Sequence, residues 1–133
     1  MSTEFPAFPD KFKEFSVDPI HIENKKKKPF DVTLKVRNSS EFGVLFKVKC
    51  TSNSRIKLVN CADILGPLEE TEVGITRLDV EPEAGDQLCV IYALVGECWI
   101  PKEKRNAYQA WLRATSQQVT TRSIFVEVSN ASD

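Results

Sequence analysis

The residues with the clearest chemical spacing in this sequence are two lysines that alternate with apolar side chains. Lys47 and Lys49 lie in a run that ends at Thr51, and Val48 and Cys50 alternate with them. Side chains two positions apart in a strand share one face, so we expect both ammonium groups to point the same way. Such a pair could attract an acidic tract, with each exposed charge pair contributing about 0.2–1 kcal/mol. A solvated outer face of a sheet is the alternative interpretation of this pattern.

These lysines belong to a longer stretch, residues 31–60, in which apolar residues alternate with polar ones, many of them lysine or arginine. This period of two is typical of β-strands. Turn residues at Asn38–Glu41 and Ser52–Ser54 divide the stretch. We therefore predict three consecutive strands with one apolar face and one basic face, over Asp31–Arg37, Phe46–Thr51 and Arg55–Val59.

Other residue types that support catalysis or metal binding are few or badly spaced. The single histidine is His21, and the cysteines have no C-x-x-C spacing, so there is little basis for a zinc site. No serine or cysteine lies in a nucleophile motif, and the five glycines are too scattered to form a phosphate-binding loop. We predict a non-enzymatic protein without metal or cofactor, whose thiols are buried: Cys50, Cys61, Cys89 and Cys98.

Two charged clusters are interpreted as solvated surface. Glu69, Glu70 and Glu72 fall where a turn leads into a strand. The run Lys25–Lys28 lies in a loop before Pro29, and contact with anionic lipid or nucleic acid is the alternative interpretation there.

Length and composition place the chain among ordinary single-domain globular proteins. It has 133 residues, of which 41% are hydrophobic and 28% charged. A net charge of −1 argues against a dedicated nucleic-acid binder. No apolar run approaches the ~20 residues that span a bilayer, and no signal-peptide core is present. We expect a cytoplasmic protein that does not insert into membranes.

The remaining elements follow from apolar periodicity and from turn residues. The first twelve residues contain two prolines and three phenylalanines, which predicts an extended arm. The alternation in Thr71–Val80 slips after Ile75, which suggests a bulge. Leu88–Val95 is apolar on both faces and suits a central strand. We further expect strands over Phe15–Val17, Ile20–Ile22 and Ser123–Val128. A turn-rich link is expected over Cys61–Glu70, a loop over Glu81–Asp86 and a tail over Asn130–Asp133. A helix is expected over Lys102–Thr115, held against the sheet by Trp111 and Leu112.

Short strands separated by turns, with only one helix, predict an all-β fold. The expected architecture is an immunoglobulin-like, seven-stranded antiparallel β-sandwich with one short helix before the last strand.

The run LKVRNSSEFGVLFKVKCTSNSRI resembles the major sperm protein (MSP) domain in the order of its strand, Asn-Ser turn, second strand and arginine-bearing hairpin. The resemblance extends to Phe15–Pro19 as an opening strand, to Ala62–Glu69 as a turn with a proline, and to Asn106–Trp111 as a helix with a buried aromatic residue. It implies a domain over residues 13–129, an arm over 1–12, a tail over 130–133, and the same sandwich fold, which is related to PapD.

The resemblance implies two functions. Stand-alone members are sperm cytoskeletal or accessory proteins of nematodes that associate with themselves, as dimers or larger assemblies, or with other family members in the cytoplasm. The related MSP domains of VAP receptors bind acidic, phenylalanine-containing peptides (FFAT motifs) along a basic strand.

Positions carried over from VAP receptors define a candidate peptide site in this chain. The family's lysine on the later strand is replaced here by Gln87, which should weaken binding of acidic peptides, and the family's K-T-T run is Lys49–Thr51 here. The candidate protein- or peptide-binding residues are Lys47, Lys49, Cys50, Thr51, Gln87 and Cys89.

Overall fold

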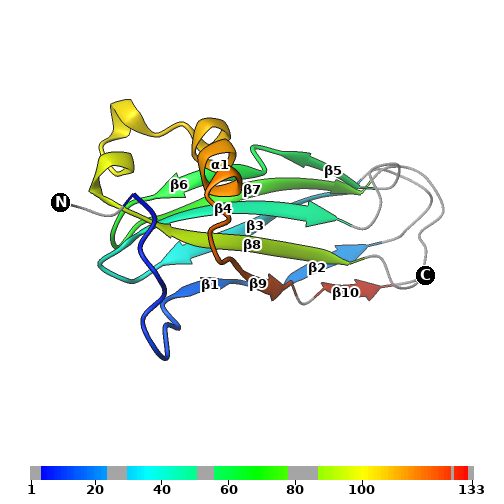
Figure 1. The fold of residues 1–133 in the computed structure, drawn as a ribbon. Coiled ribbons are helices and arrows are strands. Elements are labelled where there is room, and N and C mark those ends of the chain that lie inside the picture. Colours follow the sequence, from blue (N-terminus) through cyan, green and yellow to red (C-terminus); the bar gives the residue numbers. More distant parts are fainter. Residues whose placement is uncertain (1–3, 24–29, 51–55, 78–86, 127, 132–133) are drawn as a thin grey trace.

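Two four-stranded sheets pack face to face in the computed structural model, which describes residues 4–23, 30–50, 56–77, 87–126 and 128–131 (Figure 1). The first sheet has the order β1-β3-β7-β5 and the second has the order β6-β4-β8-β9. All neighbours within these two sheets are antiparallel. The strands of the first sheet are β1 (Phe15–Val17), β3 (Phe30–Asn38), β7 (Glu70–Arg77) and β5 (Ile56–Val59), and those of the second are β6 (Ala62–Leu65), β4 (Gly43–Cys50), β8 (Leu88–Val95) and β9 (Arg122–Phe125).

The main core lies between the two sheets because each strand turns one apolar face inward. Leu34 and Val36 of β3 and Phe46 of β4 are completely buried there. Val73 of β7 and Val90 of β8 join them with no exposed surface. The predicted sandwich fold is confirmed, and the period of two in the sequence is its direct cause.

The predicted basic face across residues 31–60 is wrong, because the three strands of this stretch do not lie in one sheet. Strands β3 and β5 belong to the first sheet, whereas β4 belongs to the second. The chain therefore crosses between the sheets twice. Lys35 and Arg37 are consequently on the opposite outer side of the molecule from Lys47 and Lys49.

A second, smaller core covers part of the outer face of the second sheet. Helix α1 (Ala107–Ser116) begins after Asn106, whose side chain accepts a hydrogen bond from the Gln109 amide. Its buried residues, Ala110 and Ala114, belong to this core, and the helix lies over β4 and β6. Small residues at helical spacing therefore make the contact. Leu112 is 49% exposed, so its expected role in holding the helix is wrong.

The structure has more strands than the sequence predicted. The two sandwich sheets contain eight strands, one more than the seven expected, because β6 forms within the link predicted over Cys61–Glu70. The predicted last strand is divided into β9 and β10 (Val128–Ala131). Strand β10 pairs in parallel with β2 (Ile20–Glu23) as a separate two-stranded sheet, so residues 130 and 131 of the predicted tail are ordered in a strand.

Two 3₁₀ turns, Glu97–Trp99 and Lys102–Lys104, precede α1, and the second occupies the start of the helix predicted over Lys102–Thr115. Strand β7 keeps its register through Arg77. No bulge therefore follows Ile75 within the described part of β7, and the loop Glu81–Asp86 and the run Lys25–Lys28 lie outside the described residues.

Candidate protein-interaction surface

The two lysines predicted to share a face do so on the outer side of the second sheet. Both side chains are exposed. Lys47 is paired in register with Ile91 of β8, and Lys49 with Cys89. Directly paired residues project from the same face of a sheet. Each lysine therefore has an apolar, half-buried neighbour at its side.

The next strand extends this pattern to the edge of the sheet. Phe125 of β9 is paired in register with Cys89, and its side chain is 70% exposed. Strand β9 ends its sheet, with no second neighbour among the described strands. We name the outward residues of this region the β4–β9 face: Lys47, Lys49, Cys89, Ile91 and Phe125.

Helix α1 closes one end of the β4–β9 face. The indole nitrogen of Trp111 donates a hydrogen bond to the backbone carbonyl of Phe46, at 3.3 Å. The adjacent outward positions Leu45, Ala93 and Val95 are buried. The outer side of this sheet is thus part core and part exposed surface, and the boundary runs beside Lys47.

A groove adjoins the two lysines on their other side, where the edges of β4 and β5 approach. Lys57 of β5 lines it together with Lys47 and Lys49. Cys50 and Cys61 also line it and pack against the main core. The groove is therefore lined by lysines from both sheets, although Lys57, which is paired in register with Thr76, projects from the outer face of the first sheet.

These three lysines have no carboxylate within 4.0 Å among the described residues, since every described ion pair involves other cations. Their positive charge is therefore available to an anionic partner. An exposed aromatic ring beside uncompensated lysines suits a segment that carries both acidic and aromatic side chains.

The other predicted site residues are distributed unevenly. Cys89 lies on the β4–β9 face, and Gln87 is exposed just before β8. Cys50 is paired in register with Leu88, which is buried, so its side chain is directed toward the core. Thr51 lies outside the described residues. The structure thus places Lys47, Lys49 and Cys89 on one face, whereas Cys50 lines the adjoining groove.

Sequence reasoning missed two members of the β4–β9 face, Ile91 and Phe125, and also Lys57 of the adjoining groove. Phe125 carried a usable signal, because it alternates with the apolar residues Ile124 and Val126. Lys57 carried no such signal, since its place near β4 depends on how the edge strand β5 of the first sheet approaches the second sheet.

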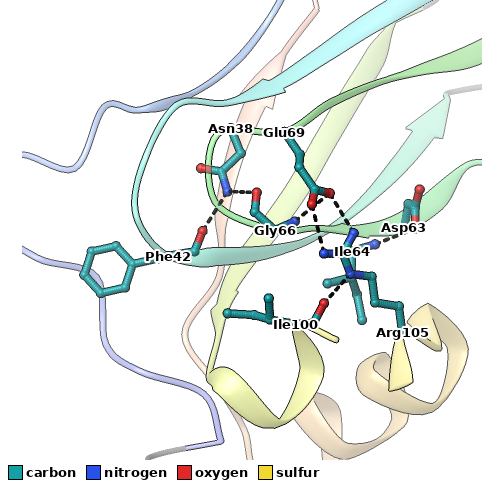
Figure 2. Close-up of polar contacts among 8 residues, drawn as sticks. All are labelled: Asn38, Phe42, Asp63, Ile64, Gly66, Glu69, Ile100 and Arg105. Atoms are coloured by element: carbon teal, nitrogen blue, oxygen red, sulfur yellow. Dashed lines mark hydrogen bonds and ion pairs between the residues drawn. The ribbon is translucent and has the colours of Figure 1, made fainter. Parts of the chain in front are cut away.

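A polar network at the opposite end of β4 fixes the turns that set the register of this strand (Figure 2). Asn38 is 1% exposed, and its amide nitrogen donates to the carbonyls of Phe42, at 2.7 Å, and Gly66, at 3.0 Å. Its side-chain oxygen accepts from the backbone amide and the hydroxyl of Ser40, at 3.0 and 2.6 Å. All four hydrogen-bonding positions of this buried amide are satisfied.

The same network contains a two-pronged ion pair between Glu69 and Arg105 (Figure 2), with contacts of 2.6 and 3.0 Å. Glu69 also accepts from the Gly66 amide at 3.1 Å, and Arg105 donates to the Ile100 carbonyl at 2.6 Å. The predicted solvated role of Glu69 is therefore wrong. A Cβ atom at Gly66 would lie 2.5 Å from the Arg105 guanidinium, so a larger residue there would displace the ion pair.

The hydrogen bond from Arg105 lowers the pKa of Glu69 below its usual value, against the opposing effect of desolvation. The same hydrogen bond raises the pKa of Arg105. Both groups stay charged near neutral pH and tie the end of β6 to the segment before α1.

Chemistry beyond binding has little support in the described part of the chain. No group of three or more His, Cys, Asp or Glu residues described here is placed to hold a metal ion. Among the helices described, none has the length and apolar character to cross a bilayer.

Comparison with known proteins agrees with this architecture. A model of the MSP (Major sperm protein) domain matches residues 8–114. No curated protein sequence matches the chain significantly. Among solved structures, the C. elegans MSP family member WR4 superimposes with a TM-score of 0.68 at 19% identity, covering 90% of this chain and all of WR4.

Two further structures share the fold. SSP-19, an MSP-domain protein like family member of C. elegans, has a TM-score of 0.57 at 22% identity, covering 77% of this chain and 89% of SSP-19. The ASH/PapD-like domain 7 of human CEP192 has a TM-score of 0.50 at 10% identity, covering 96% of this chain and 94% of that domain.

Proposed function

Because the chain belongs to the major sperm protein family, we propose that it is a structural or accessory component of the nematode sperm cytoskeleton. It acts in the cytoplasm as a non-enzymatic interaction domain. Its partners are further copies of itself or other members of the family. The β4–β9 face is the surface that makes these contacts.

The observation that supports this proposal is the exposed aromatic side chain of Phe125 at the edge of a sheet. Aromatic residues surrounded by polar ones are enriched in protein interfaces. Because β9 is an edge strand, its outward backbone groups are also available for pairing with another chain. The neighbouring helix α1 packs on the outer side of the same sheet.

Co-sedimentation with assemblies of an MSP-family protein, and sedimentation velocity of the chain alone, test this function. We expect assembly or co-sedimentation that Phe125→Ser weakens about tenfold, as for an interface anchor. Val59→Ser is the matched control, because Val59 is 47% exposed on the other sheet. Absence of both self-association and co-sedimentation, or equal effects of the two substitutions, rejects the proposal. Localisation in sperm, visualised with an antibody against the chain, tests the cellular setting.

A receptor for acidic, phenylalanine-containing peptides is the second candidate function. Its specific support is that Lys47 and Lys49, which share the β4–β9 face with Phe125, have no acidic partner among the described residues. Long-range attraction by these lysines would bring an acidic tract to the surface, and apolar contacts would seat the aromatic residue.

Titration with a fluorescent FFAT peptide tests the receptor function. We expect binding that weakens as salt rises, because exposed charges are screened within about 8 Å at physiological ionic strength. A peptide with its acidic residues replaced by serine should bind weakly. Absence of binding at low salt, or affinity that does not change with salt, rejects this function.

A further inference from the structure

The N-terminal arm, residues 4–10, is attached to the domain by a charged clamp at its start. The Glu4 carboxylate accepts hydrogen bonds from Arg113, at 2.6 and 2.9 Å, and from Gln117, at 2.6 Å. The Glu4 carbonyl accepts from the Gly96 amide at 2.8 Å. These contacts fix the arm against α1 and the end of β8.

Phenylalanines along the arm join the two cores of the molecule. Phe5 is 8% exposed and belongs to the smaller core beneath α1. Phe8 packs against the main core, with its ring 5.5 Å from that of Tyr92 and the Arg122 guanidinium 4.2 Å from its centre. The arm therefore passes from the outer side of the second sheet to the space between the sheets.

A strained turn separates the arm from the rest of the chain. The Phe12 amide donates to the Pro9 carbonyl at 3.2 Å, and Lys11 within this turn has a φ of 63°. Residues other than glycine and asparagine rarely adopt this left-handed backbone conformation. Figure 1 shows the dark blue arm reversing direction here before it enters β1. After the turn the chain is again anchored, because Phe12 is 6% exposed.

We propose that this arm is exchanged between two copies of the chain, so that the arm of each copy docks under helix α1 of the other. In the exchanged dimer the turn at Lys11 opens and the segment before Phe12 extends away from its own domain. The partner is a second copy of this chain.

A second copy fits this role because its arm offers the same contacts. Glu4 would meet Arg113 of the partner subunit, and Phe5 would fill the same apolar site. Every docking contact is thus retained, while the strain at Lys11 is relieved. Pro6 and Pro9 restrict the arm to extended conformations, which lowers the entropy lost when it reaches a neighbour.

Charge reversal in two separate samples tests the exchange directly. Glu4→Arg and Arg113→Glu each place like charges at the clamp, both within one chain and in a dimer of identical copies. When the two variants are mixed, only exchange between unlike chains restores two opposite-charge clamps. Both positions are at the surface, since the Arg113 side chain is 56% exposed and that of Glu4 23%, so folding is retained.

Native mass spectrometry, with one variant labelled with ¹⁵N, measures the result after gentle warming and cooling of the mixture. We expect a 1:1 heterodimer at least about tenfold more abundant than either homodimer. Lys35→Glu mixed with Glu70→Arg is the matched control, because that ion pair lies within a single sheet, and it should give no such preference. Monomers alone, or a random mixture of dimers, overturn the proposal.

Substitution at the turn provides an independent measurement. Lys11→Gly relieves the strain of the closed turn, so the dimer of the otherwise unchanged chain should become about tenfold weaker. Lys13→Gly is the control, since Lys13 is exposed beside the turn without a positive φ. An unchanged or stronger dimer with Lys11→Gly overturns the assignment of the hinge.

The inference deepens the self-association that belongs to the proposed function, but it can fail separately. A chain that assembles through the β4–β9 face alone would respond to Phe125→Ser and not to mixing of the clamp variants. A chain that exchanges its arm and does not bind sperm cytoskeletal proteins would respond to mixing of the clamp variants and not to Phe125→Ser.

Discussion

The two outer faces of the sandwich arise from similar sequence patterns and have opposite properties. On the first sheet, Lys35 contacts Glu70 at 3.6 Å, and Arg37 contacts Asp18 at 3.0 Å. On the second sheet, Lys47 and Lys49 have apolar partners in register and no acidic neighbour among the described residues. The alternation of a strand fixes which side chains point outward, but the neighbouring strand decides whether their charge is neutralised.

The two outer faces also differ in how far other parts of the chain cover them. Helix α1 and Phe5 bury Leu45 and Val95 on the outer side of the second sheet. On the first sheet, the outward residues Thr33 and Glu72 are exposed. One face is therefore solvated throughout, whereas the other combines a small core with an uncompensated basic and aromatic surface.

The largest expected effect comes from a charge placed under the helix. Ala110→Asp puts an unpaired carboxylate into the smaller core, where Ala110 has no exposed surface. It should lower the free energy of unfolding by about 3–4 kcal/mol. Thr33→Asp on the other outer face should change it by less than about 0.5 kcal/mol. Urea denaturation measures both, and similar losses would mean that the two faces are covered alike.

The next largest effect is expected on the binding of an acidic peptide by the basic residues of the two outer faces. Lys47→Glu with Lys49→Glu should weaken binding of an acidic FFAT peptide by about tenfold, because two attractions of about 0.2–1 kcal/mol each become repulsions. Lys35→Glu with Arg37→Glu has the same change in net charge and serves as the control, which should alter affinity far less. Fluorescence anisotropy compares the two. Equal losses would show that only net charge matters.

A third measurement examines the junction between the sheets, where Glu69 precedes β7. Arg105 lowers the pKa of Glu69 in the folded state, so the ion pair stabilises the fold fully above the usual carboxyl pKa of 4.5. This stabilisation is lost as the pH falls through the lower folded-state pKa. Near neutral pH, Glu69→Gln should cost about 1 kcal/mol, since the Glu69 side chain is 35% exposed.

The difference between Glu69→Gln and the unsubstituted chain should therefore shrink as the pH is lowered from 6 to about 3. Thermal unfolding across this range measures it. Glu97→Gln is the control, because Glu97 is exposed and forms no ion pair among the described residues. A difference that stays constant with pH would contradict the role assigned to the ion pair.

The sequence predicted the fold well because alternating apolar residues report burial directly. Leu88–Val95, apolar on both faces, was correctly predicted as a central strand, and a helix before the last strand was correctly predicted around Trp111. Local patterns of this kind depend on neighbours within a few residues, so they can be recognised in a single sequence.

The candidate site was predicted only in part, because it depends on contacts between distant segments. Lys47 and Lys49 share a face by local alternation, whereas Lys57 lines the adjoining groove only because β5, at the edge of the first sheet, lies near β4 of the second. Glu69 appeared solvated because its partner, Arg105, is 36 residues away in the sequence. The sequence does not show which acidic residue lies beside which basic one.

The smallest expected effect lies on the solvated face itself. Glu70 contacts Lys35 at 3.6 Å and Arg37 at 3.9 Å, and its side chain is 54% exposed. Ion pairs of this kind lose most of their attraction to solvent screening and side-chain entropy. Glu70→Gln should therefore cost about 0.3 kcal/mol at low ionic strength, less at 1 M salt, where the screening length is about 3 Å.

Glu72→Gln is the matched control, because Glu72 is paired in register with Lys35 but forms no ion pair among the described residues. If Glu70→Gln costs more than about 1 kcal/mol and the cost persists at high salt, the pairs on the first sheet stabilise the fold. The main role of the carboxylates would then be structural. If the cost is small, these carboxylates act chiefly by neutralising Lys35 and Arg37, which leaves the β4–β9 face as the more basic of the two outer surfaces.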